Sequence, residues 1–186
     1  GFPDEDWKVG DEIALTISAT EPGLSLVSGT VNGETVTGFT DNGDQTYDVT
    51  YTVREGGTDV ANGADVQVAF QLEDAAGVRS SEFADEITLT SGSIDSNTPS
   101  ISDVSMIDTP MKIGAISTVT IDASEGGLTL VSGQVNGADV TDFRESMGGT
   151  YRATYTVEAG GADRAADEDI PVSFVLADAN GNEAVY

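Results

Sequence analysis

The side chains that could do chemistry in this chain are overwhelmingly carboxylates. Its 186 residues include 33 Asp and Glu against 7 Lys and Arg, a formal net charge of −26, with no His and no Cys. Disulfides, thiolate catalysis and thiol-ligated zinc are therefore excluded, and the commonest general base and imidazole metal ligand are absent. The donors that remain are carboxylate and carbonyl oxygens, which suit hard cations such as calcium.

The same composition argues against several partners and against catalysis. Nucleic acid and anionic membranes would be repelled, because the Lys and Arg that neutralise phosphate are scarce. No apolar run approaches the roughly 18 residues that a membrane span needs. Paired carboxylates can hydrolyse glycosides, but 33 acids guarantee pairs by number alone. A Ser nucleophile would need a base, and the only two lysines, Lys8 and Lys112, occupy equivalent turn positions. We expect no enzyme.

An internal repeat decides the domain organisation. At a constant shift of 104 residues, about 36 of the 82 overlapping positions are identical, and LSLVSGTVNG at 24–33 returns as LTLVSGQVNG at 128–137. The chain therefore contains two copies of one module, each near the usual size of a domain. We place one domain at 1–94 and the other at 95–186.

Apolar residues alternate with polar ones in each copy, which is typical of strands with one buried face. The first copy is expected to form strands near 11–19, 24–31, 34–39, 46–53, 65–72 and 83–90, and the second a first strand near 99–107. Inward-facing positions of the second copy are taken to include Tyr151, Ala153, Tyr155, Ile170, Val172, Phe174 and Leu176. Turn sequences such as Asn32-Gly33 separate the runs. The pattern predicts an all-β chain of two tandem immunoglobulin-like antiparallel sandwiches arranged end to end.

The repeat frame also shows that each copy lacks an element. The first copy has no counterpart of residues 95–104, so most of its first strand is missing, and the second has none of 83–90, so its last strand is missing. We expect a monomer whose neighbours are other repeats of the same chain, with edge-strand pairing through the second repeat as the alternative.

Several sequence segments resemble the immunoglobulin-like extender modules of large calcium-dependent RTX-type adhesins of Gram-negative bacteria. The segments are LVSGTVNG, DNGDQTYDVTYTV, EGGTDVANGADV, LADANGN and Asp95-Ser96-Asn97-Thr98-Pro99. The resemblance covers essentially the whole chain. It implies an extracellular spacer at the bacterial surface, stiffened by calcium, that holds a distal binding domain away from the cell.

The candidate calcium ligands lie at the expected junction of the two copies. Asp95, Asn97 and Asp178 match the family pattern, and Glu125 and Asp59 are added because their loops should lie at the facing poles. The alternative for Asp95, Asn97 and Asp178 is that they form tight turns around their own backbone.

Further acids of the first copy are weaker candidates. Asp74 and Glu21 are the equivalents of Asp178 and Glu125, and would form half a site. The segment Asp41-Asn42-Gly43-Asp44 is interpreted as a plain hairpin turn, since the second copy lacks these acids and there is no distal bidentate Glu.

Two other functions share the predicted fold. The chain could be a carbohydrate- or receptor-binding module, although its predicted loops contain few aromatic residues, or an accessory sandwich of a secreted enzyme. Trp7 and the tyrosines at 47, 51, 151 and 155 are interpreted as packing residues.

Overall fold

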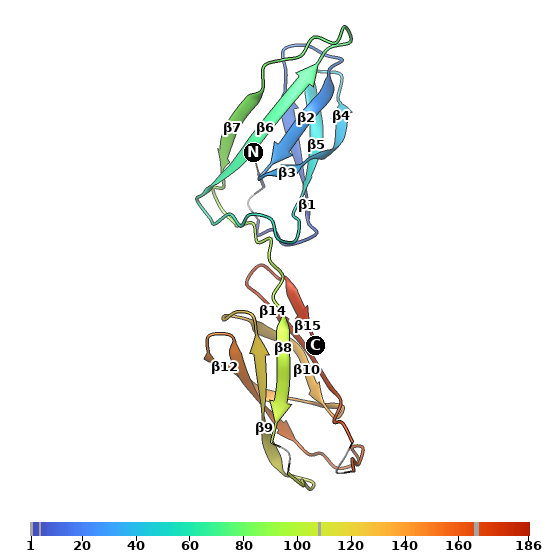
Figure 1. The fold of residues 1–186 in the computed structure, drawn as a ribbon, viewed down its shortest axis with the longest axis vertical. Helices are drawn as coiled ribbons and strands as arrows, with labels where there is room; N and C mark the ends of the chain where they lie inside the picture. The colour runs from blue at the N-terminus through green and yellow to red at the C-terminus, as the bar shows by residue number, and fades with distance from the viewer. Residues whose placement is uncertain (1, 4, 108, 166–167) are drawn as a thin grey trace. The chain divides into compact units, whose positions relative to one another are not determined.

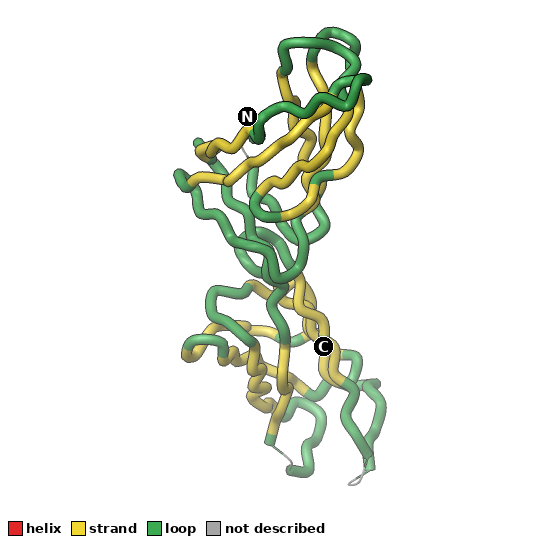
Figure 2. Tube along the Cα trace, turned by 45° about the horizontal axis from the view of Figure 1, so that its top comes forward, coloured by secondary structure: helices red, strands yellow, loops and turns green. Residues whose placement is uncertain are grey.

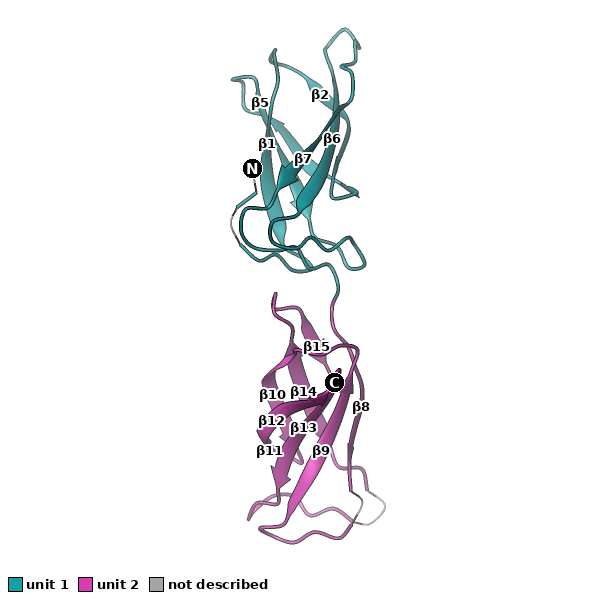
Figure 3. Cartoon of the chain, turned by 90° about the vertical axis from the view of Figure 1, so that its left-hand side faces the viewer, with its two compact units in different colours: residues 1–97 teal, residues 98–186 magenta. Residues whose placement is uncertain are grey.

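The computed structural model describes residues 2–3, 5–107, 109–165 and 168–186, and these residues form strands joined by loops (Figure 2). They divide into two compact units, Gly1–Asn97 and Thr98–Tyr186 (Figure 3). The division falls three residues after the predicted border because Asp95, Ser96 and Asn97 are hydrogen-bonded to unit 1. Within the described residues, no helix is long and apolar enough to cross a membrane.

Unit 1 is a sandwich of two antiparallel sheets (Figure 1). One sheet has the order β1-β5-β4 and the other the order β3-β2-β6-β7. The strands are β1 Glu12–Ser18, β2 Ser25–Val31, β3 Glu34–Thr35, β4 Thr37–Asp41, β5 Thr46–Thr52, β6 Asp65–Glu73 and β7 Phe83–Thr88.

Unit 2 repeats this plan with one strand gained and with a short last strand that corresponds in the repeat to residues 79–81, just before β7. Its sheets have the orders β12-β13-β9-β8 and β11-β10-β14-β15. The strands are β8 Ile101–Met106, β9 Ile116–Ala123, β10 Thr129–Val135, β11 Ala138–Asp139, β12 Thr141–Met147, β13 Thr150–Thr156, β14 Val172–Ala177 and β15 Glu183–Val185. In the repeat frame β8 has no counterpart in the described sheet of unit 1, where β1 is the edge strand. The three-residue β15 pairs with β14 over Val175 to Ala177, so part of the edge we expected to be unpaired is covered.

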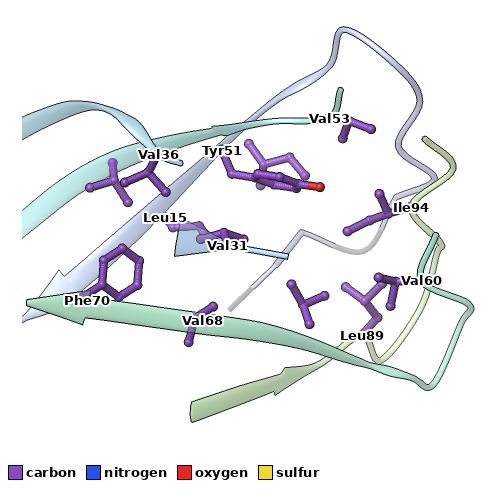
Figure 4. Packing of buried hydrophobic residues seen from close by; sticks show 13 residues of the cluster. Leu15, Val31, Val36, Tyr51, Val53, Val60, Val68, Phe70, Leu89 and Ile94 are labelled. Atoms are coloured by element: carbon purple, nitrogen blue, oxygen red, sulfur yellow. The ribbon is translucent and has the colours of Figure 1, made fainter. Parts of the chain in front are cut away.

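The core of each unit lies between its two sheets, as the alternation predicted. In unit 1, Tyr51 from β5 faces Val68 and Phe70 from β6 (Figure 4). Tyr47 and Val49 of the same strand are also buried. In unit 2, the expected residues Tyr151, Ala153, Tyr155, Phe174 and Leu176 are all buried. Trp7 is half-buried against the unit 1 cluster, which confirms it as a packing residue.

A two-residue turn in each unit ties neighbouring loops together. Asn32 and Gly33 have φ angles of 52° and 83° and connect β2 to β3, a left-handed pair that Asn-Gly adopts readily. The Asn32 side chain then donates a hydrogen bond of 2.6 Å to the carbonyl oxygen of Thr58. In unit 2, Asn136 makes the equivalent bond of 2.7 Å to the carbonyl oxygen of Ala162. The turn therefore positions the long loop that follows β5 or β13.

Two details of the predicted strands were wrong. The strand expected at 34–39 is divided, because Val36 turns inward between the sheets and Gly38 adopts a φ of 67°, so β3 pairs with β2 and β4 pairs with β5. Ile170 was expected to face inward but is 39% exposed, and β14 begins only at Val172. Pro171 precedes that strand and has no N–H to contribute to a ladder.

Candidate functional site

The end of unit 1 is closed by the segment that leads out of it. Asp59, in the loop between β5 and β6, accepts hydrogen bonds from the Ser96 backbone N–H at 2.8 Å and from Asn97 Nδ2, which lies 2.9 Å from both carboxylate oxygens. The Asn97 backbone N–H donates to Asp95 Oδ1 at 3.0 Å, which makes an Asx turn. We call Asp59, Asp95, Ser96 and Asn97 the linker anchor.

Ser96 is the buried centre of the linker anchor. Its side chain is fully buried, its carbonyl oxygen accepts the Gly56 N–H at 2.8 Å, and its hydroxyl lies 3.4 Å from the carbonyl oxygen of Thr58. A Cβ on Gly57 would lie 3.1 Å from Ser96 Oγ, so Gly57 allows the loop to close around Ser96. The sequence analysis did not identify Ser96 as a site residue. The pair Gly56-Gly57 was the available signal, because adjacent glycines often mark a place where the backbone packs closely against another segment.

Asp178, in unit 2, caps a tight turn after β14. Its Oδ1 accepts the backbone N–H groups of Asn180 and Asn182, both at 2.9 Å, and its Oδ2 accepts Asn182 Nδ2 at 2.9 Å. Asp74 occupies the same place in unit 1 and accepts the N–H groups of Ala76 and Val78, also at 2.9 Å. Both carboxylates thus bind their own loops, and for Asp178 this is the arrangement that we gave as the alternative to calcium ligation.

Glu125 and Glu21 contribute backbone oxygens to a buried tyrosine. Tyr151 donates its hydroxyl proton to the Glu125 carbonyl oxygen at 3.0 Å and accepts the Leu128 N–H at 2.8 Å. Tyr47 makes the same pair of bonds to Glu21 and to Leu24. Burial raises the pKa of the Tyr151 hydroxyl above its usual value of 10.0, so this group is neutral at physiological pH.

The acids of residues 41–44 form the plain turn that we expected. Asp41 accepts the N–H groups of Gly43 at 2.7 Å and Gly23 at 3.0 Å. Hydrogen bonds from the side chain and then the backbone of Thr46 hold the pKa of the exposed Asp44 carboxyl below its usual range. In unit 2, Glu145 replaces Asp41 and accepts the Gly127 N–H at 3.1 Å.

The predicted calcium ligands therefore divide between the two units. Asp59, Asp95 and Asn97 come together in unit 1, whereas Glu125 and Asp178 belong to unit 2. Calcium takes six to eight oxygen ligands. Asn97 presents its N–H, not its oxygen, to Asp59, so the described linker anchor does not supply such a shell. Within the described ranges, no group of three or more His, Cys, Asp or Glu side chains could hold a metal ion. Calcium binding stays a prediction.

The fold and the linker anchor define a class: an all-β protein of two antiparallel sandwich units, with a hydrogen-bonded segment at the end of the first. No protein-family model and no curated protein matches the chain. One similar solved structure is the SGBP-B protein of a mixed-linkage glucan utilization locus of Bacteroides ovatus, in complex with a mixed-linkage heptasaccharide. The identity is 17% and the TM-score 0.29, over 100% of this chain and 44% of that one. The chain thus spans less than half of that protein, and a TM-score this low supports no inference about function.

Proposed function

We propose that the chain is a structural spacer, made of tandem immunoglobulin-like repeats in the shaft of a large bacterial surface adhesin. The observation that carries the proposal is the linker anchor. A spacer that sets the reach of a distal domain must restrict the segment between its repeats, because a free linker behaves as a flexible coil. Here that segment is bonded through Ser96 and Asn97 to one carboxylate, that of Asp59.

The repetition of the same loop supports this role. Asp163 is the unit 2 equivalent of Asp59, and it is exposed. It lines a hollow of about 530 Å³ together with residues 158–162 of the loop after β13. This loop shares two features with its unit 1 counterpart, since Gly160 has a φ of 85° where Gly56 has 75°, and Asn136 bonds to it as Asn32 bonds to the loop after β5.

The placement of the aromatic residues also favours a spacer over a binding module. Tyr47, Tyr51, Tyr151 and Tyr155 are buried in the cores. Acidic side chains in the turns, including Asp74 and Asp178, bond to their own backbone, so their oxygens are already committed to the turns. Sugar-binding sites usually need convergent polar groups in a concave surface.

Calcium is the second part of the proposal. A cation bound at Asp59 would compete with the N–H groups of Ser96 and Asn97 for the same oxygens. Calcium ligation and the hydrogen-bonded anchor are thus alternative ways of holding the same segment. The chain's excess of carboxylates makes a cation-dependent gain in rigidity the natural expectation.

The test compares Asp59→Ala with Asp163→Ala in the full chain. Nuclear magnetic resonance order parameters of residues 95–97 should be about 0.85 in the parent chain and fall below about 0.6 in Asp59→Ala, whereas Asp163→Ala leaves them unchanged. Low order parameters in the parent, or no change in Asp59→Ala, would refute the anchor. Melting in millimolar calcium and in chelator tests the second part separately, because a ligand selective for the folded state must raise the melting temperature. Equal melting temperatures in calcium and in chelator would refute calcium binding but would not contradict the spacer proposal.

A further inference from the structure

Unit 1 has an apolar groove at the open edge between its two sheets. The groove has a volume of about 600 Å³ and lies between β1 of one sheet and β6 and β7 of the other. Residues 2–3 and 5–7 do not line it. Its apolar lining includes Leu15, Ile17, Phe70, Leu72, Phe83 and Ile87.

The internal repeat shows what covers this surface in the other unit. There, β8 pairs antiparallel with β9, the equivalent of β1. Ile101, Val104 and Met106 of β8 pack against the unit 2 core. A bulge between Ile101 and Asp103 lets all three apolar side chains face inward despite their uneven spacing.

Residues of unit 2 that lie near β8 are more buried than their equivalents in unit 1. Ile17 is half-buried, and its equivalent Ile121, under β8, is fully buried. Phe70 is 7% exposed and its equivalent Phe174 is 0% exposed. Leu15 and Leu72 differ in the same direction from Val119 and Leu176. Unit 1 thus leaves open a surface that its own sequence repeat closes with one strand.

The backbone of β1 directs hydrogen-bonding groups toward the position that such a strand would take. The hydrogen bonds from Ala19 N–H to Gln45 O and from Val53 N–H to Asp11 O fix which residues of β1 bond to β5. Because hydrogen-bonding direction alternates along an antiparallel strand, Ala14, Thr16 and Ser18 direct their N–H and C=O groups away from β5. The equivalents of Thr16 and Ser18 in β9 lie opposite Ser105 and Asp103 of β8.

We propose that the groove of unit 1 binds one extended peptide strand with the side-chain pattern of β8, supplied by a polypeptide segment outside residues 1–186 and paired antiparallel with β1. In the register of unit 2, a Val104-like side chain would lie opposite Ile17 and a Met106-like side chain opposite Leu15. Backbone bonds supply affinity, and the apolar side chains, which enter the groove, set the register. The proposal does not depend on the spacer function.

The test uses a peptide of residues 100–107 of this chain, with blocked ends, added to the full chain. Hydrogen exchange should slow at least tenfold at the Thr16 and Ser18 amides and change little at Leu15 and Ile17, which already bond to β5. The control peptide carries Val104→Asp and should bind at least tenfold more weakly. Phe83→Ser, at a groove residue that is 56% exposed, should weaken binding severalfold without unfolding unit 1.

A second experiment tethers the peptide strand covalently to the chain, in case the free peptide binds weakly. A flexible tether raises the effective concentration of the strand to the millimolar range. The strand is joined to Gly1 through a Gly-Ser linker, and the same two amides should become protected. No protection in the tethered chain would overturn the proposal, as would protection without the alternation along β1, which indicates apolar adsorption. Protection of these amides that appears on concentrating the chain without peptide would assign the groove to a second copy, and would also overturn it.

Discussion

The substitution Gly133→Ala tests the packing between neighbouring strands of one sheet in unit 2, where Gly133 lies directly opposite Phe174 of β14. Gly133 lies in β10, and a Cβ built there would be 2.8 Å from Phe174 Cε1, 2.9 Å from Phe174 Cδ1 and 3.0 Å from Val140 Cγ2. Its φ is outside the left-handed region, so the conflict is with side chains alone. Gly29 meets Phe70 and Val36 in the same way in unit 1, so both repeats use a glycine to seat the ring.

The expected loss follows from these distances. Ordinary carbon contacts are 3.4–4 Å, so the Phe174 ring must retreat by about half an ångström or more. The ring is fully buried, so it cannot rotate into solvent to relieve the contact. Overpacking of this kind costs about 1–3 kcal/mol, offset by about 0.4–1 kcal/mol from the stiffer unfolded chain. A net loss of about 1–2 kcal/mol lowers the melting temperature of a unit this size by about 5–15 °C.

Calorimetry of the full chain provides the assay, with Gly29→Ala used to assign the transition of unit 1. The matched control is Gly148→Ala, since no atom lies within 4 Å of the place its methyl group would take and its φ is not left-handed. That variant should melt at the parent temperature or slightly higher. A Gly133→Ala transition that stays at the parent temperature, or an equal loss in Gly148→Ala, would refute the packing argument.

Three further predictions concern polar groups. Tyr151→Phe removes both hydroxyl bonds and should destabilise unit 2 by about 1–2 kcal/mol at pH 7. Because burial raises the pKa of Tyr151 above its unfolded value, its contribution is complete below about pH 10 and lost at higher pH. Denaturant melts should therefore show a smaller alkaline loss in the Phe variant than in the parent. Asn32→Ala breaks the bond to Thr58 and a favourable left-handed turn, and should lower the stability of unit 1 by about 1–2 kcal/mol while leaving the unit 2 transition in place. Asp178→Ala should destabilise unit 2 by about 1–3 kcal/mol in chelator, since it leaves the N–H groups of Asn180 and Asn182 without their acceptor; a loss seen only in calcium would show that the side chain acts as a metal ligand and not as a turn cap.

The strands were predictable because period-two alternation is a direct consequence of one buried face. Tyr47, Val49 and Tyr51 fall inward for that reason, and the repeat transfers the result to Tyr151, Ala153 and Tyr155. The division of 34–39 between two sheets was not predictable, because it depends on Val36 filling the space beside Gly29. Ile170 was misplaced because alternation takes no account of the neighbouring Pro171 or of the strand pairing that its counterpart Val66 makes with Ile87.

The candidate site shows a different limit. That Asp59 lies near Asp95 and Asn97 followed from assigning each loop to a pole of the sandwich, and these residues are in contact through hydrogen bonds. What the contact does depends on which end of the Asn97 amide faces Asp59, and spacing in a sequence carries no information about that orientation. An amide oxygen there would join the carboxylate in ligating a cation, whereas the amide N–H found there donates a hydrogen bond to the carboxylate.

Backbone N–H groups are the partners of several carboxylates at the turns of this acidic chain. Two ion pairs in the described residues, Arg54 with Glu34 and Arg79 with Glu73, are partly exposed to solvent. Exposed pairs contribute little to stability. By contrast, Asp41, Asp74 and Asp178 each accept two or more N–H groups at a turn, and hydrogen bonds to a charged acceptor are roughly twice as strong as neutral ones. Carboxylates at these positions stabilise the turns that join the strands, so these acids contribute to the fold without a bound cation.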